Sequence, residues 1–280
     1  ESGTTAVNRA WKLLAATTSI EWRTTKWLSF LANADKSIRA PNLDDLTSRQ
    51  QTGPGFQFEN PDLKPETATT LETGVRIDHQ YLSFEGWAYH SLLSDAMTRG
   101  IRSEADCPPN TPQCQSSRRR IQLINVAGDS TIVGGELWMR AKLPGFAALS
   151  ASVSYAKGDG PSPAAPNDPN APREPLSRIP PLNGSVDLRV GGVNGPFGGV
   201  AMRWAKDQTR LSTTDYGDAR IPRFGTPGFA VVDLRAGYRM KRELVAVLVI
   251  ENITDAAYRY HGSSINGPGR GVIFSLEAGI

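Results

Sequence analysis

Three kinds of residue in this sequence could carry out chemistry: histidines, cysteines and a run of arginines. His90 is followed by Ser91, Ser94 and Asp95, which are the residue types of a nucleophilic hydrolase. On a β-strand, however, the side chains of His90 and Ser91 point to opposite faces and could not cooperate. The zinc-binding patterns H-E-x-x-H and C-x-x-C do not occur. We therefore expect no enzyme, no metal site and no cofactor, with His90 solvated or facing a polar interior. An outer-membrane hydrolase stays as an alternative.

The cysteines and the arginines lie in one polar stretch of the chain. Cys107 and Cys114 bound the segment CPPNTPQC, and such a short proline-rich spacing predicts a local disulfide formed in an oxidising compartment. Two free surface thiols are the alternative. Arg118, Arg119 and Arg120 follow after three further residues. This run could attract an anionic ligand or lipopolysaccharide phosphates, or it could be the solvated base of a loop.

The elements that must position these residues are β-strands. In 182–190, for example, Leu182, Val186, Leu188 and Val190 alternate with polar residues, and no stretch shows a convincing helical repeat. The fold class is therefore all-β. The pattern predicts eleven strands, at residues 12–23, 27–38, 67–78, 81–97, 120–142, 146–156, 182–191, 198–210, 229–240, 244–252 and 270–280.

The connections between these strands alternate in length. Short connections are expected at 24–26, 79–80, 143–145, 192–197 and 241–243, and long ones at 39–66, 98–119, 157–181, 211–228 and 253–269. Short turns at one end and long loops at the other are typical of bacterial outer-membrane barrels. Aromatic residues near strand ends fit the aromatic girdles of such barrels: Phe146, Tyr155, Trp204, Phe229 and Tyr238.

The charges of the chain support the same class. A net charge of +3 over 280 residues gives no reason to expect a nucleic-acid partner. The longest apolar run, at 244–250, has seven residues, far below the roughly 20 of a membrane-spanning helix. The second face of the strands carries charges that a dry core could not bury and that need a wet lumen or a solvated sheet face. These charges are Glu72, Arg76, Glu136, Arg140, Asp187, Arg189, Arg203, Asp233, Arg235 and Glu277. We expect an antiparallel transmembrane β-barrel segment.

Four motifs, each at a predicted strand or loop, then add a family resemblance. They are KSIRAPNLDDL at 36–46, NPDLKPETATTLETG at 60–74, NVAGDSTIVGGELWMRAK at 125–142 and ENITDAAYRYHGSSINGPGRGVIFSLEAGI at 251–280. In this order they resemble the C-terminal barrel half of TonB-dependent outer-membrane receptors, over about 27–280. We expect the motif residues to shape loops rather than to contact a ligand, with Asn60 and Glu66 satisfying loop backbone groups.

The resemblance implies a 22-stranded barrel, of which residues 1–280 supply about eleven strands without the family's plug domain. It implies a Gram-negative outer membrane, contact with its lipid and lipopolysaccharide, and work with the missing N-terminal barrel half and plug, with TonB acting through the plug. The expected function is active uptake of a scarce, unidentified small ligand such as an iron–siderophore complex. The loop 42–59 lacks the histidine of the family's haem receptors, which disfavours haem.

Two further expectations concern closure and the ligand. Eleven strands leave two unpaired sheet edges, which lipid does not tolerate, so we expect that the chain does not close alone. A self-contained porin-like or adhesin-like barrel is the alternative. Ile280 stands where the family usually has an aromatic residue. Since the long loops of such a receptor face outwards, the candidate ligand-facing residues are Arg118, Arg119, Arg120, Tyr258 and His261.

Overall fold

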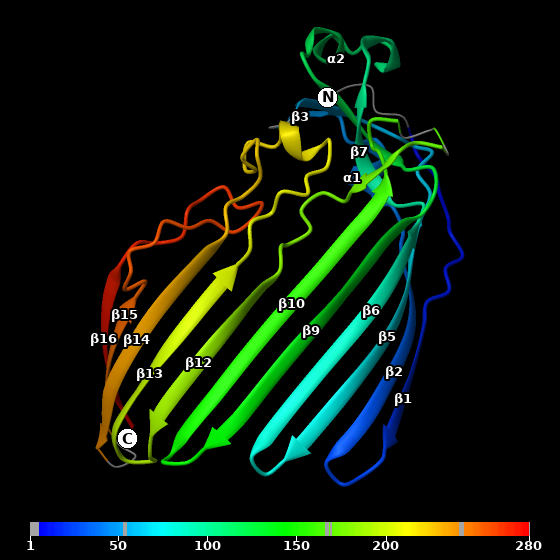
Figure 1. The fold of residues 1–280 in the computed structure, drawn as a ribbon. Helices are drawn as coiled ribbons and strands as arrows, with labels where there is room; N and C mark the ends of the chain where they lie inside the picture. Colours follow the sequence, from blue (N-terminus) through cyan, green and yellow to red (C-terminus); the bar gives the residue numbers. More distant parts are fainter. Residues whose placement is uncertain (1–5, 53–54, 166–167, 169, 241–243, 280) are drawn as a thin grey trace.

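A twelve-stranded sheet dominates the computed structural model, which describes residues 6–52, 55–165, 168, 170–240 and 244–279. Its long strands follow one another in sequence order, each antiparallel to the next and tilted side by side (Figure 1). They are β1 (Ala16–Arg23), β2 (Leu28–Arg39), β5 (Glu66–His79), β6 (Leu82–Ser94), β9 (Ser130–Leu143), β10 (Ala147–Pro161), β12 (Asn183–Gly191), β13 (Gly195–Ala205), β14 (Phe229–Met240), β15 (Leu244–Glu251) and β16 (Gly271–Ala278). The short β11 (Arg173–Pro175) pairs with the end of β10. The all-β prediction is confirmed.

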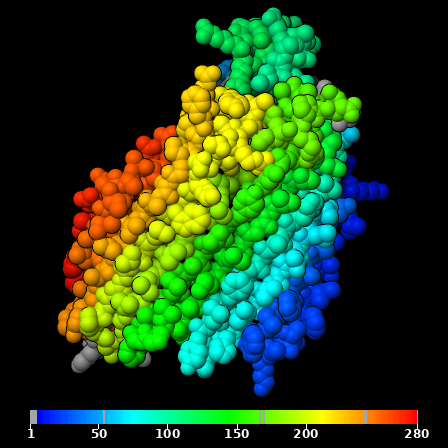
Figure 2. Space-filling view, in the orientation of Figure 1, coloured from blue at the N-terminus to red at the C-terminus, as the bar shows by residue number. Residues whose placement is uncertain are grey.

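Four short strands form a second sheet, here called the loop sheet, in the order β3 (Gln50–Thr52), β4 (Gly55–Phe58), β8 (Arg120–Asn125) and β7 (Met97–Arg102). It stands beyond the long strands, together with the helices α1 (Leu43–Thr47) and α2 (Pro112–Ser116) and the 3₁₀ turn η1 (Glu104–Asp106) (Figure 1). A further 3₁₀ turn, η2 (Asp215–Gly217), lies in the loop before β14. Figure 2 shows the green segment around α2 standing above the other loops.

The loop sheet corrects two predictions. The expected strand 120–142 is wrong, because the chain bends at Gly128, where φ is +92°, and divides it into β8 and β9. The predicted loop 98–119 begins within β7 and also holds η1 and α2. The apolar residues of β8 therefore serve the loop sheet, where Ile121 and Ile124 are buried on opposite faces of the strand, and not the long sheet. The sequence periodicity alone does not distinguish a strand of the loop sheet from a strand of the long sheet.

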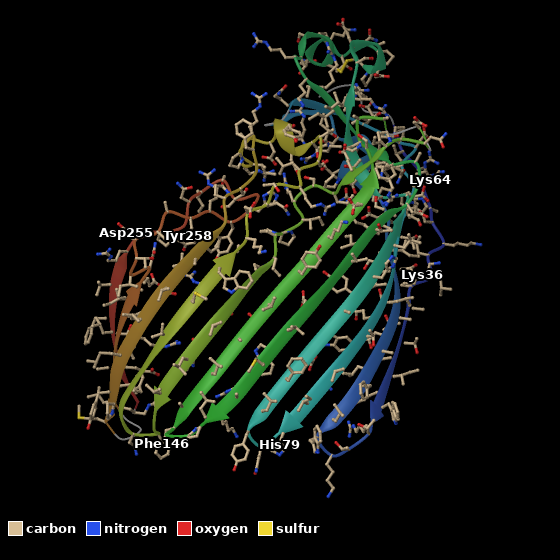
Figure 3. All side chains as sticks on the ribbon, in the orientation of Figure 1. Lys36, Lys64, His79, Phe146, Asp255 and Tyr258 are labelled. Carbon is tan, nitrogen blue, oxygen red and sulfur yellow. A yellow bond between two sulfur atoms is a disulfide. The ribbon has the colours of Figure 1, made fainter. Side chains whose placement is uncertain are left out.

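The predicted alternation of connection lengths is present in the described residues. The turns that contain or adjoin His79 and Phe146 lie at the bottom of Figure 3, while Lys64, Asp255 and Tyr258 lie at the other end with the long loops. The predicted short connection 241–243 and the terminal Ile280 lie outside the described residues. Among the residues described, the helices are too short to span a membrane.

Every neighbouring pair of long strands keeps a one-to-one register, so each face of the long sheet is continuous. The apolar face carries Trp22, Phe30, Val75, Phe84, Leu137, Val153, Leu188, Val200, Leu234, Leu248 and Phe274. The ten charges expected on the second face all fall on the other side, here called the polar face. Charge pairs cross strands there, such as Arg76 with Glu85 at 2.9 Å and Arg203 with Asp233 at 3.3 Å.

Two residues lie on the face opposite to the one expected. The sequence predicts His90 to be solvated or to face a polar interior. It is exposed, but it pairs with Leu71 and Val133 on the apolar face, so the expectation of a polar interior is wrong. Phe229 lies on the polar face, where its ring packs against Tyr258 with 5.0 Å between centroids, so it does not belong to an outward girdle. In both cases the side chain points to the face of the sheet opposite to the one expected from the sequence.

Candidate functional site

The first two motifs meet at the top of β2 and β5. Arg39 and Glu66 are register partners, with Arg39 Nη1 3.4 Å from Glu66 Oε1. Arg39 Nη2 lies 3.0 Å from Asp45 Oδ2 in α1, and the Met97 amide donates to Glu66 Oε2 at 2.8 Å. Two carboxylates and one guanidinium thereby tie both strands to α1 and to the start of β7.

Side-chain amides fasten the segment after β4 to β8. Asn60 Nδ2 donates to the carbonyl of Leu123 at 2.8 Å. Asn125 Nδ2 donates to the carbonyls of Lys64 and Asp95 at 2.9 and 2.7 Å, and Asn125 Oδ1 accepts the Lys64 amide at 2.8 Å. The expected roles of Asn60 and Glu66 in satisfying loop backbone groups are therefore confirmed.

A disulfide joins Cys107 to Cys114 at the outer end of the loop sheet. Cys114 is fully buried and belongs to a small core with Phe56 and Phe58. Arg120 Nε donates to the Cys114 carbonyl at 2.9 Å, and Arg120 also donates to a second carbonyl of α2. The guanidinium of Arg120 is therefore occupied by main-chain carbonyls of α2 at the end of the disulfide loop.

A buried ion pair supports the same end of the loop sheet. Arg49 Nε donates to Glu59 Oε2 at 2.6 Å, and Arg49 Nη1 donates to Thr111 Oγ1 at 3.4 Å, next to α2. The hydrogen-bonded carboxylate of Glu59 raises the pKa of Arg49 above its ordinary value. Arg49, held by Glu59 within the 39–66 loop, thus joins this loop to the disulfide loop through its hydrogen bond to Thr111.

An open basin of about 760 Å³ lies between the loop sheet and the loops on either side of η2. Four arginines, Arg99, Arg119, Arg178 and Arg220, line it with a single carboxylate, that of Asp218. Arg178 and Arg220 each place Nη2 2.7 Å from Asp218 Oδ2. We call this cavity the arginine basin. Its excess of guanidinium groups favours an anionic occupant.

The arginine basin also has an apolar side. Met97, Ile101, Ile121 and Leu123 of β7 and β8 contribute to its lining. Arg119, which directly precedes β8, donates to the Gly217 carbonyl at 3.4 Å, which joins the start of β8 to η2 across the basin. A pocket that combines apolar walls with a few charged groups is typical of small-molecule sites.

The first part of the last motif folds into a compact loop between β15 and β16. Asn252 is 1% exposed with φ at +48°, and its side-chain Nδ2 donates to the carbonyls of Ala256 and Pro268 at 2.9 and 3.1 Å. Tyr258 covers Gly267 so closely that a Cβ there would overlap its ring. The N-x-T-D-x-x-Y and P-G-R segments thus fold onto each other and fix Tyr258 in place.

Tyr258 belongs to an aromatic cluster at the top of β13 and β14. The rings of Phe229, Tyr258 and Tyr260 lie 5.0–5.9 Å apart, and the Arg203 guanidinium lies 6.0 Å from the Tyr258 ring centre. Phe229, Tyr260, Arg203 and His261 line a second cavity of about 470 Å³. This cavity is more aromatic and less charged than the arginine basin.

His261 is held in the same region. Its Nδ1 is 2.9 Å from Thr226 Oγ1, while its Nε2 is buried without a hydrogen-bond partner. Burial lowers the pKa of His261 below its ordinary value, a shift that the carboxylate of Asp215 opposes and the guanidinium of Arg178 assists. The neutral imidazole is therefore the favoured form in the folded loops.

The five predicted ligand-facing residues fall into different surroundings. Arg119 lines the arginine basin, Arg118 is exposed outside it, and Arg120 is bound to carbonyls of α2. Tyr258 is only 6% exposed, and His261 lines the second cavity. Their contact with a ligand stays a prediction.

Sequence reasoning missed the other three arginines of the basin. Arg99, Arg178 and Arg220 come from three separate segments, so no local spacing links them, and only their place in long loops could have marked them. In the part of the chain that the structure describes, no group of three or more His, Cys, Asp or Glu is arranged to hold a metal ion.

Comparisons with known proteins agree with this architecture. The family model described as "TonB dependent receptor-like, beta-barrel" matches residues 4–253. The copper transporter OprC superposes with a TM-score of 0.70 at 20% identity, covering 94% of this chain and 39% of that protein. The ferric enterobactin receptor PfeA of Pseudomonas aeruginosa gives 0.66 at 15% identity, covering 94% and 40%. The hemophore receptor HasR of Serratia marcescens, solved with its hemophore HasA and heme, gives 0.67 at 18%, covering 94% and 39%.

The matched regions cover nearly all of this chain but less than half of each solved protein. This chain spans about two fifths of the length of each of the three solved proteins. At these levels of identity the superpositions establish the fold. No curated protein matches the sequence.

Proposed function

This chain belongs to the TonB-dependent receptor-like β-barrel family, and from that premise we propose that it forms part of the wall and of the extracellular vestibule of an uptake receptor. TonB-dependent receptors are outer-membrane proteins of Gram-negative bacteria, and the solved proteins that the chain resembles are transport receptors. The proposed receptor takes up a scarce ligand, and energy reaches its plug through TonB. The plug and the remaining strands come from the rest of the receptor.

The two faces of the long sheet carry this proposal. The continuous apolar face suits lipid, and the polar face, with its cross-strand ion pairs, suits an aqueous interior. Within the described residues, β1 and β16 each pair on one side only. Since unpaired strand edges are not tolerated in lipid, further strands are needed to complete the barrel.

The arginine basin supports an anionic ligand with an apolar portion, of which an iron–siderophore complex is an example. Four guanidinium groups face a single carboxylate there, beside the apolar side chains of β7 and β8. The hydrolase alternative gains no support, because His90 and Ser91 lie on opposite faces of β6.

The test uses the complete receptor and the double variant Arg99→Gln/Arg119→Gln. We expect its affinity for anionic ferric catecholate complexes to fall by at least about tenfold, because each charge-assisted hydrogen bond contributes roughly 1.5–3 kcal/mol. The measurement is binding by calorimetry, together with growth on those complexes as the iron source. Neutral ferric hydroxamate complexes serve as the uncharged comparison.

Arg223→Gln is the matched control. It makes the same kind of substitution, with the loss of one positive charge, at an exposed side chain of the loop around η2, where Arg223 lies over the ring of Phe224 and not in the basin. Its binding should equal that of the unchanged receptor. Equal binding by the double variant would instead remove the basin from the proposal, and a receptor that supports growth on none of the iron complexes would argue against an iron cargo.

A further inference from the structure

Three cationic side chains converge on one residue, Asp159, at the outer end of β10. Arg210 Nη2 lies 2.6 Å from Asp159 Oδ1, and Lys157 Nζ lies 3.8 Å from Asp159 Oδ2. Arg173 Nη2 donates to the main-chain carbonyl of Asp159 at 2.8 Å. We call Lys157, Asp159, Arg173 and Arg210 the β10 cation group.

The β10 cation group lies on the apolar face. Lys157 and Asp159 alternate in phase with Val153 and Tyr155, which belong to that face. Lys157 pairs with Val133 and Asp159 pairs with Thr131 across β9. No residue of the group lines the arginine basin, and the side chains of Lys157 and Asp159 point away from the polar face.

Its height on β10 follows from strand geometry. Tyr155, 46% exposed, is an outward aromatic residue of the kind that marks the membrane interface in β-barrels. At about 3.3 Å per residue, Lys157 and Asp159 lie roughly 7 and 13 Å beyond Tyr155 along the strand. Towards the short turns the same face continues with Val153, Ala151 and Leu149. The β10 cation group thus begins where the apolar band ends.

The group keeps a cationic excess and remains accessible. The side chain of Lys157 is 47% exposed, that of Arg210 39%, and Arg173 is also exposed. The neighbouring carboxylate of Asp129 accepts a hydrogen bond from Ser94 Oγ at 2.7 Å, while its main-chain carbonyl accepts from Arg173 Nη1 at 2.9 Å. The carboxylate of Glu174 accepts from Ser212 and Thr213 instead.

We propose that the β10 cation group binds a phosphate group of an outer-leaflet lipid, as carried by the headgroup of a phosphorylated lipopolysaccharide. Guanidinium groups match phosphate oxygens with paired N–H donors, and Lys157 adds a mobile point charge. This inference rests on the proposed function, because it needs the apolar face to meet the outer membrane. It also assigns the lipid contact to a surface other than the run Arg118–Arg120.

The experiment measures the lipopolysaccharide that copurifies with the complete receptor, by native mass spectrometry in mild detergent. The triple variant Lys157→Ser/Arg173→Ser/Arg210→Ser should retain at least about tenfold less lipid, as expected for the loss of charge-assisted contacts. Lys36→Ser is the matched control, because Lys36 lies on the apolar face at the outer end of β2, outside the group. The control should retain as much lipid as the unchanged receptor, and equal retention by the triple variant would overturn the inference.

Two further arms identify the source of the phosphate. Stripped receptor should rebind phosphorylated lipid A from vesicles and not its dephosphorylated form, while an excess of inorganic phosphate should leave the lipid bound. Rebinding of both lipid forms, or displacement by inorganic phosphate, would contradict a lipid-phosphate site. The single variant Lys157→Ser changes only a loosely paired, exposed side chain, so its expected severalfold loss does not depend on how the triple variant folds.

Ligand uptake separates this inference from the proposed function. The triple variant should support the same uptake as the unchanged receptor, since no residue of the β10 cation group lines the arginine basin. Phosphate-dependent lipid retention by a receptor that transports none of the iron complexes would leave the lipid site standing and remove only the iron cargo.

Discussion

The wall of long strands and the loop region beyond it are held by different kinds of contact. In the wall, each strand pairs with the strands that come before and after it in the sheet through an unbroken register, as β9 does with β10. In the loop region, single side chains join distant parts of the chain: Asn60 reaches Leu123, and Arg178 reaches Asp218. The structure of the wall therefore depends on whether each position is apolar or polar, whereas the structure of the loop region depends on the identity of individual residues.

The largest effect that separates the two regions should come from a charge on the wall. Val200→Arg places a guanidinium on the apolar face near the middle of β13, opposite Leu188 and Leu234. An arginine at the membrane midplane costs about 2–4 kcal/mol in β-barrels. We expect the complete receptor to lose most of its folded, membrane-inserted form, measured by heat-modifiable migration and by its amount in outer membranes.

The neighbouring residue gives the matched control. Ala201→Arg places the same group on the polar face, where Ala201 pairs with Asp187 and Asp233. Two nearby carboxylates compensate the added charge, so assembly should stay close to that of the unchanged receptor. Equal losses from both substitutions would show that the two faces do not differ in the way the wall requires.

The disulfide gives the largest effect expected in the loop region. Cys107→Ser/Cys114→Ser opens a loop of seven residues' separation, and chain-entropy reasoning assigns about 2.5 kcal/mol to its closure. The carbonyls of α2 should then lose their fixed position against Arg120. Hydrogen exchange should accelerate in β7, β8 and α2, while the wall strands keep their protection. Faster exchange in β9 and β10 as well would show that the wall and the loop region open together as one cooperative unit.

Substitution of a loop residue in the last motif should have a smaller and more local effect. Asn252→Ala leaves the Ala256 and Pro268 carbonyls and the Ala256 amide without their buried partner, at a cost of about 2 kcal/mol. Proteolysis between β15 and β16 should become faster, with unchanged assembly. Asn266→Ala, which removes only a contact with Arg259 at the surface, is the control and should have no comparable effect.

The same difference decides what the sequence could predict. Alternation in 182–190 placed that strand and both of its faces, because period two is a property of neighbouring residues. The arginine basin could not be predicted, because Arg99, Arg178 and Arg220 meet only after three loops have folded. The strand 120–142 failed for a related reason: β8 alternates as a wall strand does but finds its partners in β4 and β7.

The smallest expected effect concerns pH in the loops near His261. Because its pKa is lowered in the folded loops, opened loops take up a proton more readily than closed ones as pH falls. Closed loops should keep full stability above the ordinary value of 6.5 and lose it progressively as pH falls towards the lowered pKa. Exchange in 253–267, corrected for intrinsic rates, should therefore accelerate below about pH 6.5 in the unchanged receptor, as expected when the closed form binds fewer protons.

His261→Gln should remove this slope, because glutamine does not titrate and can still reach Thr226 with one polar group. His79→Gln, at the short-turn end of β5 in the wall, should leave the slope in place. A slope that persists without His261 would assign the titration to another loop group. A slope shared by the wall strands would instead show that the two regions open together, which is the outcome that their different contacts argue against.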